Sequence, residues 1–572
     1  MNSKLTVLYI IIDAKDVKKL PSNIFTCFSL SPYLKVKDHL KVIYPNPLNS
    51  SREAEKQLLN TEEIFNFIFN KLSINLGGKS QEQFRELLKP YLDLKISIYL
   101  YLKNCIPNNK IYKVFIGGKW KIFKSKSKLI IGIENLYLNQ KSNVYNFLGK
   151  YTKYNYNFIK NILAHIQILV FKKLLENRST YILSCENSYF MPTIYKEVNK
   201  NNKNILAYSQ SHNIAKQIII IIKQISTIIL NKKIISIEFF LIPFIQVKNH
   251  NSFFKIVNNI NNLIDNEYFF HLINDIKKYM LVTQGYTNYS NQLFRDLKNK
   301  NITAIFHTNR FPDLHSLSMV LYKIGCEQHL ITHGTHTINN ESKTGQIISD
   351  SLAIGMLTSS IPNIKIYSQS KFSDDFLSHK NLYFRKIKPV NNLNIISRKN
   401  SKVFNILSAG TVKQLGARRH YFESSFEYIF CITDLCKKLK KLNFKVQLTI
   451  RIRGVKNEID DNIIKNIESQ FKGLVKISNK KSLEEDIVNS DCLIALSSTT
   501  LEQAINFNIP SMSYGLSKYN HFSFYQDKKY KINKDLKNYS KLKIIEKILG
   551  RDFVFFNRND LKREKEIFDF IL

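Results

Sequence analysis

From about residue 300 onward, short apolar stretches alternate with amphipathic stretches, and this alternation constrains the fold more than any other feature of the sequence. Short apolar stretches are typical of buried strands, and amphipathic stretches are typical of helices. Strands and helices that alternate at this spacing form parallel sheets with crossover helices. The sequence therefore predicts an α/β fold with doubly wound sheets in this part of the chain.

The alternation is most regular after residue 402. Strands are expected at 403–411, 445–453, 474–478, 491–497 and 509–514, and helices at 421–442, 458–471, 483–489 and 501–508. A similar unit precedes it, with strands at 303–308, 329–334 and 364–370 and helices at 313–325 and 371–377. The basic, Asn- and Ser-rich stretch 384–402 between the two units has the composition of a linker.

The first 300 residues are less regular. Strands are expected at 4–12, 40–44, 128–133, 181–184 and 204–208, and amphipathic helices at 52–72, 81–103 and 155–176. We expect an N-terminal α/β domain enlarged by helical insertions over 1–390, a Rossmann-like domain over 403–535 and a helical tail over 536–572. The tail is expected to cross back and pack on the first domain.

The chain is strongly basic, with 85 Lys and Arg against 45 Asp and Glu and a formal net charge of +40. One interpretation is a surface for nucleic acid, anionic lipid or anionic glycan. The other is compositional drift, because Lys, Asn and Ile are frequent throughout. The basic residues are scattered and form no nucleic-acid motif, so we favour drift combined with a generally basic face. Such a face still attracts an anionic membrane surface.

Cysteine spacing and hydropathy indicate the cellular compartment in which this chain is expected to fold. The seven cysteines form no CxxC pair and no zinc spacing, so they read as small buried apolar residues in a reducing compartment. Residues 5–12 lack the basic flank and cleavage site of a signal peptide. The apolar segments 214–230 and 234–247 are interrupted by charge and too short to span a bilayer. We expect 214–230 to be a helix buried between layers, with a membrane-surface helix as the alternative.

Ligands of open α/β sheets bind at the carboxyl ends of the strands, where the strand order reverses. Basic and hydroxyl side chains dominate those ends in this sequence, and acidic side chains are scarce, which suits an anionic ligand. The residues concerned are His307, Asn309, Arg310, His333, Gly334, His336, Gly410, Thr411, Arg451, Arg453, Ser497, Ser498, Thr499 and Thr500.

The segment 496–515 is the most specific of these. Four consecutive hydroxyl residues, 497–500, join a strand to a helix whose first turn holds Glu502. Hydroxyls at a helix start can cap its free N–H groups, but a cap uses only one or two of them. The same N–H groups and the helix dipole favour a bound phosphate. We therefore expect phosphate binding here.

The run S-S-T-T-L-E-Q-A at 497–504, followed by I-P, resembles the donor-nucleotide segment of GT-B glycosyltransferases. The loop S-A-G-T at 408–411, with Arg418 and Arg419 beyond it, resembles the first donor-side loop of that domain. T-H-G-T-H at 332–336 is similar to the His-Gly strand end of transferases that build capsule, lipopolysaccharide and teichoic-acid polymers. The resemblance covers about residues 300–530. One departure is R-I-R-G at 451–454, where several CMP-sugar-using relatives carry a His-Pro pair, so the nucleotide base stays open.

The resemblance implies a site. Ser497, Ser498, Thr499 and Thr500 would face the donor phosphate and Glu502 its ribose. Gly334, His336, Gly410 and Thr411 would line the phosphate site, and Arg418, Arg419, Arg451 and Arg453 would clamp it. The resemblance also implies an enzyme without metal or cofactor, and the spacing around His333 and His336 offers no acidic or Cys partner for zinc.

Three side chains compete for the role of catalytic base. His333 could accept the proton of the acceptor hydroxyl or, when protonated, steady the departing phosphate. Asp313 and Asp13 are the carboxylate alternatives, and Asp313 could instead cap the helix that follows it.

We therefore expect a cytoplasmic glycosyltransferase, peripheral to the inner face of the membrane, that moves a sugar from a nucleotide donor to a surface polysaccharide or lipid-linked acceptor. Alternatives are a CDP-glycerol-type polyol-phosphate transferase, a nucleotide-sugar epimerase, and a non-catalytic basic scaffold for anionic lipid or nucleic acid.

Overall fold

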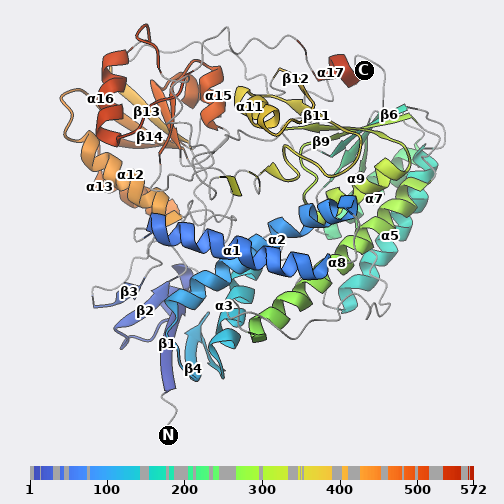
Figure 1. Ribbon diagram of the computed structural model, residues 1–572, viewed down its shortest axis with the longest axis horizontal. Helices are drawn as coiled ribbons and strands as arrows, with labels where there is room; N and C mark the ends of the chain where they lie inside the picture. Colours follow the sequence, from blue (N-terminus) through green and yellow to red (C-terminus); the bar gives the residue numbers. More distant parts are fainter. Residues whose placement is uncertain are drawn as a thin grey trace.

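The computed structural model describes most of the chain. The described residues are 5–12, 14–29, 39–43, 50–73, 78–141, 154–175, 180–185, 204–209, 214–230, 236–243, 266–295, 301–332, 346–347, 350, 353–388, 402–409, 425–451, 461–478, 482–495, 500–514, 532–536, 538–555, 565 and 567–571. Within them the chain forms three sheets, which confirms the α/β class (Figure 1).

The C-terminal sheet is wholly parallel with the strand order β15-β14-β13-β16-β17. In chain order this is 3-2-1-4-5, the Rossmann-like order. Its strands are β13 (Phe404–Ala409), β14 (Val446–Arg451), β15 (Val475–Ser478), β16 (Cys492–Ala495) and β17 (Ser511–Ser513). Its helices are α12 (Ser425–Leu439), α13 (Asp461–Gln470), α14 (Leu483–Val488), α15 (Thr500–Asn506) and α16 (Tyr539–Leu549). Every strand and helix expected between 403 and 514 is confirmed.

Alternating residues of β13 explain why this sheet is covered on both faces. Ile406 belongs to a core shared with α12, α13 and α16, whereas Leu407 belongs to a core shared with α14 and α15. Successive side chains of a strand point to opposite faces, so an apolar strand needs helices on both.

The middle sheet repeats the same design with seven parallel strands in the order β12-β11-β10-β9-β6-β7-β8. Its strands are β6 (Thr180–Cys185), β7 (Asn204–Tyr208), β8 (Ser236–Phe239), β9 (Asn301–Phe306), β10 (Glu327–Ile331), β11 (Ile364–Ser368) and β12 (Phe384–Lys386). Its helices are α5 (Tyr154–Leu175), α7 (Ile214–Ile229), α8 (Asn266–Phe294), α9 (Pro312–Lys323) and α11 (Lys371–His379). The strand order reverses between β6 and β9.

The N-terminal residues form a third sheet, in the order β3-β2-β1-β4-β5, which the sequence did not predict as a separate unit. Its elements are β1 (Leu5–Ile11), the 3-10 helix η1 (Ala14–Lys19), β2 (Thr26–Ser29), β3 (Lys41–Ile43), α1 (Ser50–Leu72), α2 (Gly78–Cys105), β4 (Ile111–Ile116), β5 (Lys119–Phe123) and α3 (Lys126–Lys141). Only β5 runs antiparallel to its neighbour.

The strand expected at 128–133 is wrong, because these residues lie in α3. Leu129, Ile130 and Ile133 are buried at a helical spacing. Gly132 sits against Phe123 of β5, where an added Cβ would come within 2.6 Å of the ring. The glycine therefore lets the helix pack closely on the sheet.

Helix α8 joins the N-terminal and middle units. Its 29 residues span about 43 Å. Tyr268 and Ile276 in its first half belong to the N-terminal core, whereas Tyr286 and Leu293 in its second half belong to the core of the middle sheet. Figure 1 shows this helix running along both units.

The middle and C-terminal sheets also contact each other. Phe372 of α11 belongs to the same apolar cluster as Leu407 of β13 and Leu501 of α15. The C-terminal helix α17 (Phe568–Ile571) packs instead on the middle sheet, where Phe568 lies in one cluster with Ile305 and Tyr367. The chain thus returns to the middle sheet after completing the C-terminal one.

Two further sequence expectations need correction. The expected linker 384–402 begins with β12, which pairs with β11, so its first residues belong to the sheet. Helix α7 is not buried between layers: Gln217, Ile220, Ile221 and Gln224 are buried, but the opposite face is exposed. No described helix is long and apolar enough to cross a membrane. Cys27, Cys326, Cys431, Cys436 and Cys492 are free, and all of these but Cys326 are buried.

Candidate active site

The reversal point of the C-terminal sheet lies between β13 and β16, which pair directly. The Thr500 hydroxyl donates a 2.6 Å hydrogen bond to the carbonyl of Ala409, the last residue of β13. Thr500 is also the first residue of α15. One contact therefore ties the start of this helix to the carboxyl end of the central strand.

Two of the expected donor-site residues flank this contact. Gly410 follows Ala409 in the chain, and Thr499 precedes Thr500. Glu502 lies in the first turn of α15 and is partly exposed. The described residues Ala409 and Thr500, which adjoin the two hydroxyl-bearing segments in the sequence, therefore lie in contact at one point of the sheet.

Arg451 has a partner that the sequence did not reveal. Its guanidinium Nη1 lies 2.5 Å from Asp486 Oδ2, and the same carboxylate oxygen accepts a 2.5 Å hydrogen bond from the Ser478 hydroxyl. These residues stand at the ends of β14 and β15 and on α14. Arg451 therefore holds neighbouring strand ends together, and its expected phosphate contact stays a prediction.

Several expected site residues lie outside the described part of the chain. These are Asp13, His333, Gly334, His336, Gly410, Thr411, Arg418, Arg419, Arg453, Ser497, Ser498 and Thr499. Thr332, the residue before His333, is described at the end of β10. Its carbonyl accepts a 2.7 Å hydrogen bond from Gln369 Nε2, and its backbone N–H donates to Tyr367. These two hydrogen bonds therefore fix the position of Thr332, the residue directly before His333, between the ends of β9 and β11.

Asp313, the carboxylate candidate, lies at the reversal point of the middle sheet. It is buried in the first turn of α9, and its carboxylate accepts hydrogen bonds from the Tyr208 hydroxyl and from the Leu314 N–H, the latter at 2.9 Å. Tyr208 ends β7 and α9 follows β9, so the contact crosses the end of β6. The helix N-cap is Phe311, so Asp313 is not the N-cap residue, although it satisfies one N–H of the first turn.

Two buried histidines lie within six residues of Asp313 in the sequence. Burial and the neighbouring Arg310 lower the pKa of His307 to about 3. Burial also lowers the pKa of His315 to about 4, against a hydrogen bond with the Asn309 backbone. Both imidazoles are neutral at physiological pH, so they can orient polar groups but carry no charge for a phosphate. Tyr208 and His315 were not singled out from the sequence, although Tyr208 ends an expected strand.

Glu86 of α2 connects the N-terminal unit to this region. Its carboxylate accepts hydrogen bonds from the Ser360 N–H, at 2.6 Å, and from the Ser360 hydroxyl. The neighbouring Ser359 hydroxyl accepts a 2.6 Å hydrogen bond from Asn309, which follows β9. Burial raises the pKa of Glu86 from 4.5 to about 7, the Ser360 contacts oppose this rise, and Glu82 adds to it.

Glu86→Gln is expected to raise the free energy of unfolding at about pH 8 by roughly 1–3 kcal/mol relative to wild type. The folded state raises the pKa of Glu86 to about 7. The contribution of Glu86 to the free energy of unfolding is therefore fully present below pH 4.5, where Glu86 is protonated in both states. It is lost as the pH rises through 7 and Glu86 ionises in the folded state. A neutral glutamine escapes that loss, so urea unfolding at about pH 4.5 should show no difference between the proteins. An equal difference at both pH values would contradict this.

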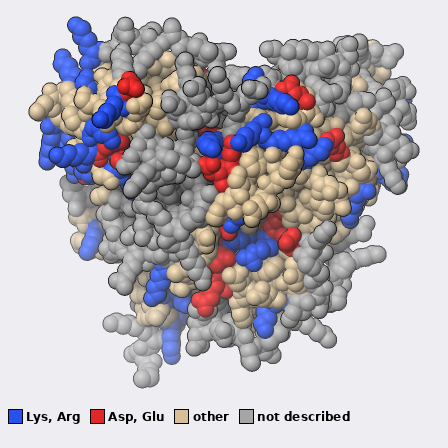
Figure 2. All heavy atoms as spheres, turned by 45° about the horizontal axis from the view of Figure 1, so that its top comes forward, with Lys and Arg blue, Asp and Glu red and all other residues tan. Residues whose placement is uncertain are grey.

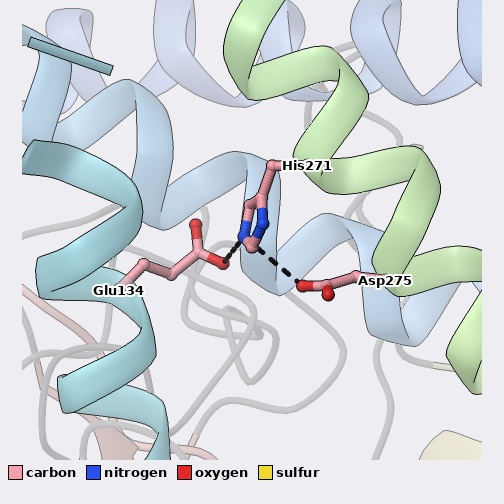
Figure 3. Close-up of side chains that lie close together, drawn as sticks. All are labelled: Glu134, His271 and Asp275. Carbon is pink, nitrogen blue, oxygen red and sulfur yellow. Dashed lines mark ion pairs between the residues drawn. The ribbon is translucent and has the colours of Figure 1, made fainter. Parts of the chain in front are cut away.

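A buried ionic cluster lies between α2, α3 and α8. The Lys95 ammonium is 2.8 Å from Glu134 Oε1 and also contacts Asp275. His271 Nε2 lies 3.8 Å from Glu134 and 3.4 Å from Asp275, as Figure 3 shows. Burial raises the pKa of Glu134, and Lys95 and His271 more than offset this and hold it below its usual value. The Tyr268 hydroxyl donates a 2.5 Å hydrogen bond to Glu134.

Glu134, His271 and Asp275 are close enough to share a metal ion, since their ligand atoms lie within 4.8 Å of one another. The Lys95 ammonium already supplies the positive charge that these carboxylates need, and its side chain is 1% exposed. A divalent cation would have to displace it at a large electrostatic cost. We therefore interpret the cluster as a structural ion network that fixes α8 to the N-terminal unit.

The described charged side chains on one face of the molecule are of both signs. On the face drawn in Figure 2, described Lys and Arg side chains form several separate groups, with Asp and Glu side chains among them. Binding of a polyanion by charge alone needs a continuous basic stripe or patch.

Partial likenesses to solved structures accompany this geometry. They include a UDP-GlcNAc 2-epimerase from Neisseria meningitidis bound to UDP-GlcNAc, at 12% identity, 58% of this chain, 80% of that chain and a TM-score of 0.30. The structure of S. aureus MnaA with UDP is 8% identical, over 58% of this chain and 78% of that chain, with a TM-score of 0.32. The wall teichoic acid polymerase TagF is 11% identical, over 64% of this chain and 79% of that chain, with a TM-score of 0.26. No family model and no curated protein matches the sequence.

Proposed function

We propose that this chain is a metal-independent GT-B-type glycosyltransferase, with its nucleotide donor held at the reversal point of the C-terminal sheet. The observation that carries the proposal is the hydrogen bond between Thr500 and Ala409. This bond holds Ala409 and Thr500 together. They are the residues next to Gly410 and Thr499 in the sequence, so both hydroxyl-bearing segments adjoin the place where Rossmann-like sheets bind ligands.

The chemistry of these loops suits a phosphorylated donor. The N–H groups and dipole at the start of α15 favour an anion, and the hydroxyls of 497–500 add donors around it. Glu502 in the first turn would hold the ribose. Arg418, Arg419 and Arg453 would neutralise the diphosphate, and Arg451 would add to them from its pair with Asp486.

The middle sheet would carry the acceptor side. An acceptor hydroxyl oxygen attacks the anomeric carbon of the sugar, the bond from that carbon to the donor phosphate breaks, and the nucleotide leaves. His333 or Asp313 takes the proton of the hydroxyl. The contact between Phe372 and the cluster of Leu407 and Leu501 supports this arrangement, because it joins the two sheets beside β13. The acceptor would be a surface polysaccharide or a lipid-linked glycan at the inner membrane face.

A thermal unfolding screen against UDP, CMP, GDP and CDP tests the donor site. One of these nucleotides is expected to stabilise the protein by about 2.7 kcal/mol at 100 times its dissociation constant. A product analysis with the matching activated donor then separates the reactions. Transfer of the sugar alone supports the proposal, whereas phosphate retained in the product would assign a polyol-phosphate transferase. Conversion of the donor without an acceptor would assign an epimerase. Protection by none of the four would favour a non-catalytic scaffold.

A further inference from the structure

Helix α7 carries a stripe of exposed isoleucines. Ile218, Ile222, Ile225 and Ile229 follow one another at spacings of four, three and four residues, so they line one side of the helix. Their exposed fractions reach 58% at Ile222 and 74% at Ile229. The opposite side, which includes Ile220 and Ile221, packs into the core. The stripe is therefore apolar surface that the fold itself does not use.

Helix α5 also carries large apolar side chains that are exposed. It packs beside α7, and Figure 1 shows both helices at the right-hand edge of the molecule. Ile162 and Leu169 on its outer side are 43% and 70% exposed. Together with the stripe on α7 they form what we call the α5–α7 face: Ile162, Leu169, Ile218, Ile222, Ile225 and Ile229. Soluble chains seldom expose so many large apolar side chains on adjoining helices.

The charged side chains on the two helices of the α5–α7 face are all of one sign. Neither helix contains an Asp or a Glu. The exposed lysines Lys216 and Lys223 flank the stripe on α7, and Lys172 and Lys173 end α5. Lysines beside an apolar stripe can lay their methylene stems along it and keep the ammonium at a polar boundary. This combination of apolar face and basic flank fits the boundary layer of an anionic bilayer.

A second copy of the chain is the other candidate for covering this face. In a two-fold dimer the same patch meets itself. The lysines of one α7 would then lie close to those of the other, with no acidic residue on either helix to pair with them. Like charges at such an interface are destabilising. Charge complementarity therefore favours an anionic partner over self-association.

We propose that the α5–α7 face is the surface by which this protein docks on an anionic phospholipid bilayer, with the stripe of α7 at the acyl boundary and the lysines at the headgroups. This deepens the membrane contact in the proposed function. It also has a geometric consequence. Helix α7 begins at Ile214, six residues after Tyr208, the last residue of β7, whose hydroxyl contacts Asp313 at the reversal point of the middle sheet. Docking would hold that edge near the lipid, where a lipid-linked acceptor is anchored.

Co-flotation of the full chain with phospholipid vesicles tests the proposal. Wild-type protein is expected to float with vesicles that contain phosphatidylglycerol and to stay behind with pure phosphatidylcholine. Ile222→Asn combined with Ile229→Asn should weaken flotation by at least about tenfold. Lys216→Gln combined with Lys223→Gln should weaken it by about fivefold for each lysine and reduce its salt dependence.

Matched controls use equivalent side chains elsewhere. Ile122→Asn removes an isoleucine that is 68% exposed on β5. Lys465→Gln with Lys472→Gln removes two exposed lysines, one on α13 and one two residues after its end. Both controls should float like wild type. Equal flotation of the Ile222/Ile229 variant and wild type would overturn the proposal. The proposal would also be overturned if the wild-type protein formed a dimer and bound no vesicles, and if the Ile222/Ile229 variant were a monomer. Nucleotide stabilisation is measured separately, so failure of docking and failure of the donor site are distinguishable.

Discussion

Replacing Lys95 with methionine is expected to lower the free energy of unfolding by about 3–5 kcal/mol. The Lys95 ammonium contacts both Glu134 and Asp275, and the Lys95 and Glu134 side chains are 1% and 0% exposed. Without the ammonium, two carboxylates remain in a region of low dielectric, compensated by His271 and, at Asp275, by the exposed Lys278. Either they stay ionised at a large desolvation cost, or they bind protons, and both outcomes destabilise the fold.

The structure offers a matched control for this substitution. Lys278 also approaches Asp275, at 3.7 Å, but its side chain is 56% exposed. Lys278→Met is expected to change the free energy of unfolding by less than about 1 kcal/mol, as for other solvent-screened pairs. Adding Glu134→Gln and Asp275→Asn to Lys95→Met should recover part of the loss. Urea unfolding of the four proteins measures these differences, and a loss below about 1 kcal/mol for Lys95→Met would contradict the account.

His333→Ala is expected to lower the rate of sugar transfer by about 10²–10⁴-fold while leaving nucleotide stabilisation nearly unchanged. His333 follows Thr332, which Gln369 and Tyr367 hold at the end of β10. The histidine would act on the acceptor hydroxyl, so its loss affects the reaction more than donor binding. Single-turnover kinetics with saturating donor separates the two effects.

Asp313→Asn is the companion experiment, since Asp313 is the carboxylate alternative. If Asp313 is the base, its substitution produces the large loss and His333→Ala does not. Tyr208→Phe removes the hydroxyl that Asp313 accepts from and tests whether this contact positions the carboxylate. His379→Ala replaces an exposed histidine at the end of α11 and should leave turnover unchanged. Wild-type turnover in both His333→Ala and Asp313→Asn would remove both residues from the mechanism.

The C-terminal sheet could be predicted from the sequence because its strands are short apolar stretches, and these alternate with amphipathic stretches of helical periodicity. In α3, by contrast, Leu129, Ile130 and Ile133 belong to a brief apolar run that resembles a strand, so the sequence predicts the wrong element there. The sequence also does not assign the faces of α7. When isoleucines fill five consecutive positions, apolar periodicity cannot distinguish the buried side from the exposed side.

The candidate site divides in the same way. Strand ends and helix starts are local features, so Thr500 and Glu502 could be placed at the start of α15 from the sequence. Contacts between distant positions could not. Arg451 pairs with Asp486 and Tyr208 with Asp313 because the strand order brings their strand ends together. Nothing in the intervening residues signals either pair, and burial of His307 and His315 likewise depends on the assembled core.

Hydrogen–deuterium exchange with and without the stabilising nucleotide tests the central claim most directly. If the donor binds at the reversal point of the C-terminal sheet, protection should concentrate in peptides covering 404–424 and 492–506, on both sides of the Ala409–Thr500 bond. Peptides from the N-terminal sheet should exchange as before. Protection confined to residues outside the C-terminal sheet, or no change anywhere at saturating nucleotide, would contradict the account.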